Sequence, residues 1–431
     1  MKVLVVGGGG REHALCWKLR QSPLLTELYC APGNPGISQV ADLVPIAAEE
    51  VQRLADFATE MKIDLVVVGP ELPLTLGLVD ELTARGLKAF GPTMRAAELE
   101  GSKVFSKEFM QRHGIPTAPF AIVHGAEQAR EIRGRFGWPV VIKADGLAAG
   151  KGVVIAADEA EYDAAVRELF EDRRFGAAGD RAIVEGFLDG EEVSFMALSD
   201  GERVLPLATA KDYKRIGDHD TGPNTGGMGS HSPAGVMSAE AAAEVLETVI
   251  RPTVAGMAAE GRPFVGVLYA GLILTPEGPR VLEFNARFGD PECQAILLRL
   301  EDDLLAVLAA GARGEFDVRR LSFRKEVSAC IVLASPGYPG RPVTGEPIRG
   351  LDQAAGPGVE IFHAGTAMSG GADGNLVSAG GRVLSVCATD PDLAGALRKA
   401  YAAAERVDWP GKVYRRDIGR RVLEKVNAAG S

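Results

Sequence analysis

The sequence predicts an α/β protein of several domains that begins with a parallel sheet, and three observations lead to this prediction. Short apolar runs alternate with helical stretches over about the first hundred residues, as in a parallel sheet whose strands are joined by helices. From Ser102 the pattern changes, and after about residue 324 strands rich in Val and Gly precede one last helix. A chain of 431 residues also exceeds one ordinary core and corresponds to roughly two to four domains.

The composition indicates a folded enzyme that acts on small molecules. Hydrophobic residues make up 46% and charged residues 24% of the chain, without the depletion typical of disorder. A formal charge of −11 disfavours an extended face for nucleic acid or an anionic membrane. Five scattered cysteines without a CxxC pair argue against a disulfide framework or a zinc site and favour a reducing compartment. Because the chain starts directly with a strand and has no apolar run of ~20 residues, we expect a cytoplasmic protein.

The first segment is expected to be the parallel unit, and a second unit starts near Ser102. The predicted strands of the first unit are the apolar runs 2–6, 27–30, 65–69 and 88–91. The second unit starts with a helix through Phe109 and a Pro-rich linker at 114–120. Strands at 138–144 and 152–157 then bracket a glycine-rich loop.

The middle of the chain holds a long polar stretch, 211–233, that we expect to be structureless and functional, because so long a loop inside a domain usually is. A helix is predicted at about 239–260 and a leucine-rich helix near 292–311. The last helix is predicted at 390–407, within the third unit.

The opening VLVVGGGGREHAL places glycines at a strand-to-helix turn, where free backbone amides and a helix N-terminus can hold a phosphate. It does not match a dinucleotide fingerprint, because Glu12 stands at the sixth position and no acidic residue ends the second strand. A tight turn that needs glycine for packing alone is the alternative. The cluster Arg11, Glu12 and His13 at the end of a strand favours a binding site.

A second glycine-rich loop lies in VVIKADGLAAGKGVVIA, residues 140–156. A strand delivers Lys143, and the loop carries Lys151, so two cations and many free amides suit a polyphosphate. It is not a Walker loop, because Gly152 stands where Ser or Thr is required. An ordinary glycine-rich hairpin is the alternative.

The strand RVLEFNARFGDPE, residues 280–292, brings Glu283, Asn285 and Arg287 to one face by its period of two. A carboxylate and an amide oxygen suit Mg²⁺, and an arginine can neutralise a phosphoryl group in transfer. In this interpretation Leu282, Phe284 and Ala286 form the core side, whereas a solvated strand face is the alternative.

Asp212 and the PNTGGMG segment, residues 223–229, lie between these two phosphate elements and are interpreted as a substrate loop, with a disordered linker as the alternative. The isolated His113, His124 and His363 show no metal-ligand spacing. The cysteines lack the context of a catalytic nucleophile.

Seven motifs in this order, GGREHAL, IKADGLAAGKGV, EGFLDGEEVSF, DTGPNTGGMG, YAGL, EFNARFGDPE and HAGT, closely resemble the glycinamide ribonucleotide synthetases, the phosphoribosylamine–glycine ligases of the ATP-grasp superfamily. The match runs from Met1 to about Gly419. The resemblance implies an N-terminal α/β domain at 1–102, an ATP-grasp core at 103–323 with a small lid at about 121–187, and a mixed β/α C-terminal domain at 324–431.

The resemblance also implies roles for particular residues. The catalytic set is Arg287, Lys143 and Asp212, and the metal ligands are Glu283 and Asn285. The expected ATP-binding residues are Lys103, Lys143, Gly150, Lys151, Gly152, Glu185, Phe187, Leu188 and Glu192. The expected substrate-binding residues are Gly9, Gly10, Arg11, Glu12, His13, Asn224, Thr225, Gly226, Gly227, Asp290, Arg415 and Arg416, of which the two last resemble the arginines that hold a ribose phosphate in related enzymes.

The implied reaction uses ATP and Mg²⁺ or Mn²⁺ to convert glycine to glycyl phosphate, which the amine of 5-phosphoribosylamine then attacks. The implied protein is a monomer or a small homo-oligomer. Many ATP-grasp enzymes carry a further metal-binding acid on the preceding strand, where this chain has Tyr269, Gly271 and Ile273. The residues alone leave two alternatives, an ATP-grasp enzyme that acts on bicarbonate or formate and a non-catalytic nucleotide-binding protein.

Overall fold

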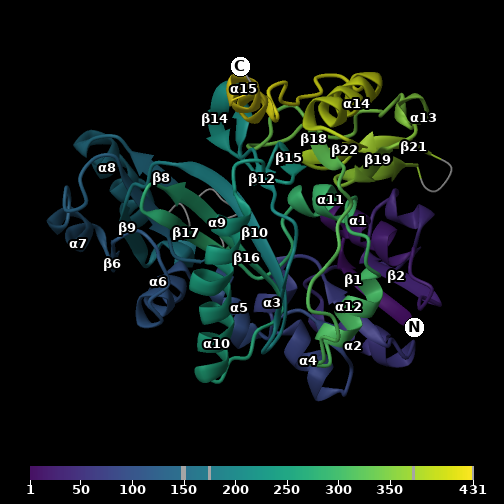
Figure 1. Ribbon diagram of the computed structural model, residues 1–431, viewed down its shortest axis with the longest axis horizontal. Helices are drawn as coiled ribbons and strands as arrows, with labels where there is room; N and C mark the ends of the chain where they lie inside the picture. Colours follow the sequence, from purple (N-terminus) through teal and green to yellow (C-terminus); the bar gives the residue numbers. More distant parts are fainter. Residues whose placement is uncertain (147–151, 173–175, 371–373, 430–431) are drawn as a thin grey trace.

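The computed structural model describes residues 1–146, 152–172, 176–370 and 374–429 (Figure 1). The chain opens with a five-stranded sheet in the order β3-β2-β1-β4-β5, in which every pairing is parallel. The predicted parallel α/β unit is therefore confirmed. Its strands are β1 (Lys2–Gly7), β2 (Glu27–Pro32), β3 (Asp42–Leu43), β4 (Leu65–Val68) and β5 (Ala89–Phe90), and its helices are α1 (Gly10–Leu19), η1 (Ile37–Gln39), α2 (Val51–Glu60), α3 (Glu71–Thr75), α4 (Leu78–Ala84) and α5 (Met94–Gly101).

The order of this sheet reverses at β1, because β2 pairs with one edge of β1 and β4 with the other. In an open parallel sheet, such a reversal leaves a crevice at the carboxyl ends of the two central strands. Helix α1 starts at Gly10, directly after β1, and α3 starts at Glu71, directly after β4. The residues that begin these two helices therefore face the same edge of the sheet.

A small antiparallel sheet in the order β6-β9-β7-β8 follows helix α6 (Lys103–Arg112). Buried aliphatic side chains of the sheet pack against Ala129, Tyr162, Val166 and Leu169 of its helices. The elements are β6 (Phe120–Val123), α7 (Ala126–Glu131), β7 (Val140–Ala144), β8 (Val153–Ala156), α8 (Glu159–Val166), η2 (Arg167–Glu171), η3 (Gly176–Gly179) and β9 (Ala182–Gly186).

A longer antiparallel sheet, β11-β10-β16-β17, forms the second half of the ATP-binding region expected from the sequence. The predicted leucine-rich helix is two helices, because Asp303 caps a new helix through the amides of Leu305 and Ala306. The elements are β10 (Glu191–Asp200), β11 (Val204–Pro206), α9 (Ala239–Val245), η5 (Leu246–Ile250), α10 (Arg251–Ala259), β16 (Val265–Thr275), β17 (Gly278–Asn285), α11 (Glu292–Leu297) and α12 (Leu304–Gly311).

The sequence suggested that the stretch 211–233 is structureless, and this prediction is wrong. Its segment Lys211–Asp212 (β12) pairs with Gly229–Ser232 (β15), and β15 also pairs with Val327–Ala334 (β18) of the C-terminal region. These strands belong to the sheet β12-β15-β18-β22-β19, which spans the expected boundary at 323/324. Polar residues can form strands here because the strands are short and backbone hydrogen bonds hold them. The elements are β12 (Lys211–Asp212), β13 (Arg215–Gly217), η4 (Asp218–Asp220), β14 (Thr221–Asn224), β15 (Gly229–Ser232), β18 (Val327–Ala334), α13 (Leu351–Ala354), β19 (Val359–His363), β20 (Thr366–Ser369), β21 (Asn375–Ser378), β22 (Arg382–Asp390), α14 (Leu393–Arg406) and α15 (Arg420–Ala429).

The N-terminal and C-terminal regions meet at two buried histidines. The backbone N–H of His363 on β19 donates to Nδ1 of His13 on α1 at 2.8 Å, and Asn34 donates to the carbonyl oxygens of Gly8 and His363. Burial and the neighbouring His363 lower the pKa of His13 to about 3, and burial lowers the pKa of His363 to about 4. Both rings are therefore neutral in the folded protein at neutral pH.

These histidines predict a loss of stability in mild acid. Their pKa values are lowered on folding, so below the unfolded pKa of 6.5 the unfolded chain binds more protons, and stability falls as pH decreases. Each histidine should lower the free energy of unfolding by about 2 kcal/mol as the pH falls from 6.5 to 5. Urea unfolding of the double variant His13→Gln/His363→Gln should show a weaker pH dependence than the wild type. The exposed His124→Gln is the control, and an unchanged slope in the double variant would contradict the assignment.

The polypeptide contains no helix, among those described, that is long and apolar enough to cross a membrane.

Candidate active site

A cavity of about 840 Å³ lies where the small sheet, the β10–β17 sheet, the N-terminal unit and the C-terminal region meet. Most of the residues expected from the sequence to bind ligands line it. They are Arg11, Lys103, Lys143, Gly152, Glu185, Phe187, Leu188, Glu192, Asp212, Asn224, Thr225, Gly226, Glu283, Asn285, Arg287, Asp290 and Arg415.

The expected residues that the structure describes but that do not line this cavity are Gly9, Gly10, Glu12, His13, Gly227 and Arg416. Gly150 and Lys151 lie outside the described residues.

On the small sheet, Glu185 of β9 joins two lysines in a buried cluster. Lys143 Nζ lies 2.6 Å from Glu185 Oε1 and donates to the carbonyl oxygen of Leu282 at 2.9 Å. Lys107 of α6 pairs with the other oxygen of Glu185 and donates to Thr117 Oγ1. Burial opposes ionisation of Glu185, but the two lysines lower its pKa. An ammonium has three donors, so Lys143 keeps one for a ligand.

Lys107 was missed in the sequence, although it lies one helical turn after Lys103 and so on the same face of α6. Burial lowers the pKa of Lys107 to about 8. Lys103 donates to the carbonyl oxygen of Gly146 at 3.1 Å. Asp145 accepts from Ser102 Oγ and from the amide of Val104, so the start of α6 is tied to the end of β7.

The expected metal pair lies on β17. Glu283 and Asn285 both line the cavity, as the period of two predicted. The expected core side is only partly right, because Val281, Phe284 and Ala286 are buried whereas Leu282 is half-buried. The reason is a register shift against β16, which pairs Glu283 with Gly271 and Val281 with the adjacent Leu272.

The donor chemistry of this pair fits a hard divalent ion. Burial opposes ionisation of Glu283, but Lys214, Lys143 and Lys103 lower its pKa, so its carboxylate is charged. No group of three or more His, Cys, Asp or Glu side chains suited to a metal occurs within the described parts of the chain. Two protein ligands are enough for Mg²⁺ when phosphate and water complete its coordination.

Arg287 is held by two carboxylates of the N-terminal unit. Its Nε lies 3.2 Å from Glu71 at the start of α3, and its Nη2 lies 3.2 Å from Glu100 on α5. Glu100 also accepts from the amide of Ala286 at 2.7 Å. Burial disfavours the charged guanidinium, but Glu100 and Glu71 raise the pKa of Arg287 above its ordinary value. Neither glutamate was predicted from the sequence.

In the glycine turn after β1, the polar groups bond to one another. The amide of Gly9 donates to Glu12 Oε2 at 2.6 Å, and Arg11 Nε lies 2.6 Å from Glu12 Oε1. Glu12 is thus buried behind the turn and orients Arg11, whose Nη1 donates to the carbonyl oxygen of Phe288. The amide of Gly9, expected to face an external anion, is bonded within the protein.

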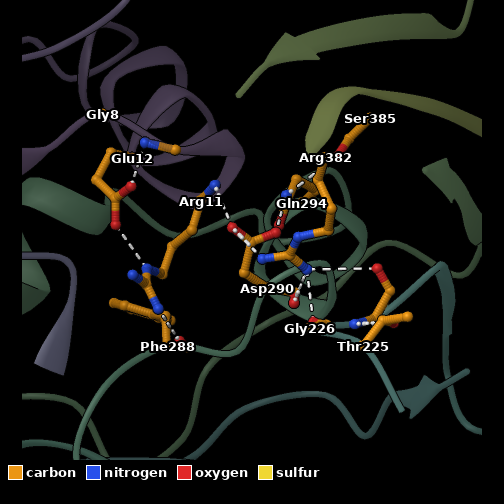
Figure 2. A network of polar contacts seen from close by, with 12 residues as sticks. Gly8, Arg11, Glu12, Thr225, Gly226, Phe288, Asp290, Gln294, Arg382 and Ser385 are labelled. Carbon is orange, nitrogen blue, oxygen red and sulfur yellow. Dashed lines mark hydrogen bonds and ion pairs between the residues drawn. The ribbon is translucent and has the colours of Figure 1, made fainter. Parts of the chain in front are cut away.

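Figure 2 shows how Asp290 connects three parts of the chain. Asp290 accepts from the amide of Arg11 at 3.4 Å and from Gln294 at 2.7 Å, and it pairs with Arg382 of β22 at 3.3 Å. Arg382 also donates to the carbonyl oxygens of Asp290 and Gly226. Arg382 therefore fixes the loop between β14 and β15, and no sequence motif had indicated it.

The two arginines expected to hold a ribose phosphate lie in different surroundings. Arg415 is buried, and its guanidinium is bound by Asp417 at 2.8 Å on two sides and by Asp220 at 2.8 Å. Arg416 has a side chain that is 65% exposed, and it lines a separate surface hollow with Trp409 and Tyr414. The structure does not bring these two side chains together in the cavity.

The cavity lies between two antiparallel sheets and is lined by lysines, by a carboxylate–amide pair suited to a divalent ion and by the half-buried Arg287. This arrangement defines an ATP-grasp enzyme, a class that uses ATP with a divalent metal ion. Family models support this class. The N domain of phosphoribosylglycinamide synthetase matches residues 1–100, its ATP-grasp domain matches 101–293 and its C domain matches 328–421. The chain therefore belongs to the phosphoribosylglycinamide synthetase family, the ATP-grasp ligases of purine biosynthesis.

Similar proteins agree with this assignment. The phosphoribosylamine–glycine ligase of Mesorhizobium japonicum is 50% identical over 429 residues, which cover 100% of both chains. That of Brucella melitensis is also 50% identical, over 99% of this chain and 100% of the relative. The crystal structure of the Thermotoga maritima ligase has a TM-score of 0.84 and 35% identity, and the match covers 97% of this chain and 100% of that one. A biotin carboxylase of Campylobacter jejuni, at 17% identity and a TM-score of 0.75 over 96% and 92% of the two chains, shares the fold. The ligase activity and the fold class expected from the sequence are confirmed.

Gly227 is so closely packed that a side chain at this position should destabilise the protein. Gly227 has φ +112°, and a Cβ added there would lie 2.5 Å from Pro291 Cδ and 2.7 Å from Asp212 Oδ1. Gly345 has φ +90° and no atom within 4 Å of an added Cβ. Gly345→Ala should therefore lose only about 1 kcal/mol of stability from backbone strain.

Gly227→Ala should lose more, about 2–4 kcal/mol, because strain and overpacking add, and its kcat/KM should fall about 10-fold or more as Asp212 is displaced. Urea unfolding and steady-state kinetics of both variants measure these losses. Equal effects in the two variants would show that the loop tolerates a side chain at this position.

Proposed function

We propose that this chain joins glycine to 5-phosphoribosylamine through glycyl phosphate, with release of ADP and phosphate. The observation that carries the proposal is the convergence of Lys143, Glu283, Asn285 and Arg287 on one cavity. A carboxylate resists attack by an amine, and phosphorylation by ATP gives it a good leaving group. This set of cations and metal ligands is suited to phosphoryl transfer and offers no covalent nucleophile.

In this proposal the protein acts by holding charge in place. Mg²⁺, or Mn²⁺ with the same ligands, bound to Glu283 and Asn285 would neutralise the phosphate oxygens of ATP. The free donor of Lys143 contacts the transferring phosphoryl group, and Arg287 stabilises the negative charge that develops on it. Glu71 and Glu100 fix the guanidinium of Arg287 before substrates bind, so little reorganisation is needed during the reaction.

The nucleotide and the second substrate are assigned to different parts of the cavity. Backbone groups from Glu185 to Leu188 bind adenine, Glu192 binds the ribose of ATP, and Lys103 with the loop at Gly150, Lys151 and Gly152 binds its phosphates. The 5-phosphoribosylamine contacts Arg11 and the loop residues Asn224, Thr225 and Gly226. Arg415 also lines this part of the cavity. Because it pairs with Asp417 and Asp220, we assign it a structural role in the cavity wall and no direct contact with the substrate.

We keep the division into domains at 1–102, 103–323 and 324–431, with the lid at about 121–187, as part of the proposal. The cytoplasm is the proposed location, in agreement with the reducing compartment inferred from the cysteines. A monomer or small homo-oligomer is the proposed assembly.

The proposal predicts that ADP release requires glycine, phosphoribosylamine and a divalent ion together. Omission of any one should reduce ADP release to background, and Glu283→Gln should reduce kcat about 100-fold or more without loss of stability, because one metal ligand loses its charge. Coupled measurement of ADP and a melting curve test both points. The matched control is Glu277→Gln on the exposed turn before β17.

ADP release with bicarbonate or formate in place of glycine would favour the other carboxylate ligases. ADP release without any second substrate, or nucleotide binding without turnover, would also contradict the proposal.

A further inference from the structure

Lys107 of helix α6 lines the cavity, although its side chain is only 3% exposed. Its Nζ pairs with Glu185 of β9, donates to Thr117 Oγ1 at 2.6 Å and lies 5.7 Å from the centre of the Phe120 ring. Burial lowers the pKa of Lys107 to about 8 and the charge of Glu185 opposes this change, so the ammonium is charged at neutral pH. A cation so deeply buried is costly, and the nucleotide contacts proposed above do not use it.

The charges of the cluster around Lys107 do not cancel. Glu185 has one carboxylate and contacts two ammonium groups, that of Lys107 at Oε2 and that of Lys143 at Oε1, the latter at 2.6 Å. The three side chains therefore carry one net positive charge. Each of them is at most 7% exposed, so solvent ions screen this charge weakly. Without Lys107, Glu185 and Lys143 would form a neutral pair.

The cluster is anchored on the strand that carries the proposed metal ligands. Thr117, which accepts from Lys107, donates to the carbonyl oxygen of Val281 at 2.6 Å. Lys143 donates to the carbonyl oxygen of Leu282, the next residue of β17, at 2.9 Å. These two carbonyl groups immediately precede the proposed metal pair. The cluster therefore ties α6 and the small sheet to β17 beside the site assigned to the phosphates.

We infer that Lys107 is a positioning residue that takes up the charge of Glu185, so that Lys143 faces the phosphates of ATP with its full charge and a free donor. This inference rests on the role of Lys143 in the proposed function. A carboxylate shared by two lysines compensates each of them only in part, so the cluster holds Lys143 in place and still attracts a polyphosphate. Lys107 acts through Glu185 and does not itself contact the nucleotide.

The direct test is Lys107→Met, which keeps an unbranched side chain beside Phe120 and removes the charge. Glu185 and Lys143 then form a one-to-one pair, so the Kd for ATP should rise about 10- to 100-fold. The Kd for adenosine, which lacks phosphates, should stay within about threefold of the wild-type value. Equilibrium titration with both ligands gives the ratio of the adenosine Kd to the ATP Kd, and this ratio should fall about 10-fold or more.

Two further variants separate charge from packing. Lys143→Met removes the proposed phosphate contact itself, so its ratio should fall by at least as much. Thr117→Val removes the neutral partner of Lys107 and keeps the charge, so its ratio should change less than about threefold. A structural role for Lys107 would weaken both ligands equally and leave the ratio of Lys107→Met unchanged, which would overturn the inference. An equally large fall in Thr117→Val would also overturn it.

The double variant Lys107→Met/Glu185→Gln tests the inference even if Lys107→Met does not fold. It removes one cation and one anion, so the net positive charge of the cluster is kept and resides on Lys143. The new amide oxygen can still accept from Lys143. The ratio should therefore stay within about threefold of the wild-type value. A ratio as low as that of Lys143→Met would overturn the inference.

The inference and the proposed function fail in different ways. An unchanged ratio in Lys143→Met would refute the role of Lys143, and the inference with it. A lowered ratio in Lys143→Met with an unchanged ratio in Lys107→Met would refute only the role of Lys107. Wild-type protein that binds ATP but releases no ADP with glycine and phosphoribosylamine would refute the proposed ligation, whereas the binding ratios would still decide the role of Lys107.

Discussion

Arg287 and Asp290 in this cavity are each compensated by a charge from another part of the chain, and the packing of the three regions depends on these pairs. Arg287 lies on the segment after β17, but Glu71 and Glu100 of the N-terminal unit hold it. Asp290 is neutralised by Arg382 from the C-terminal region. Because removal of one partner leaves an unpaired ion in a largely buried site, such pairs fix the regions relative to one another at the proposed site of phosphoryl transfer.

The same constraint explains which groups face a ligand. Glu185 satisfies two lysines and leaves Lys143 with one free donor, so a phosphate can bind without displacing the cluster. Glu12 and the amide of Gly9 satisfy each other, which turns Glu12 into a support for Arg11.

The sequence predicts the parallel sheet and the convergence of Glu283, Asn285 and Arg287 on one cavity, because these follow from local periodicity and from motifs whose residues lie close together along the chain. It does not predict Glu71, Glu100 or Arg382, because each acts on a residue about 90 to 220 positions away. The stretch 211–233 was misjudged for the same reason. One of its strands, β15, pairs with β18, which starts almost a hundred residues later, while β13 and β14 pair with each other. Arg415 and Arg416 look equivalent in sequence, yet only their tertiary surroundings show that one is buried and the other exposed.

The central claim is that the carboxylate of glycine becomes an acyl phosphate on the cations of this cavity. The most direct measurement uses glycine labelled with ¹⁸O in both carboxylate oxygens and follows the label into the products. When the amine attacks the carbonyl carbon, the bridging oxygen leaves with phosphorus, so each inorganic phosphate should carry one labelled oxygen. Unlabelled phosphate would contradict the account, because ATP hydrolysis would then drive ligation by another route, and the roles of Lys143, Glu283 and Arg287 proposed above would fail.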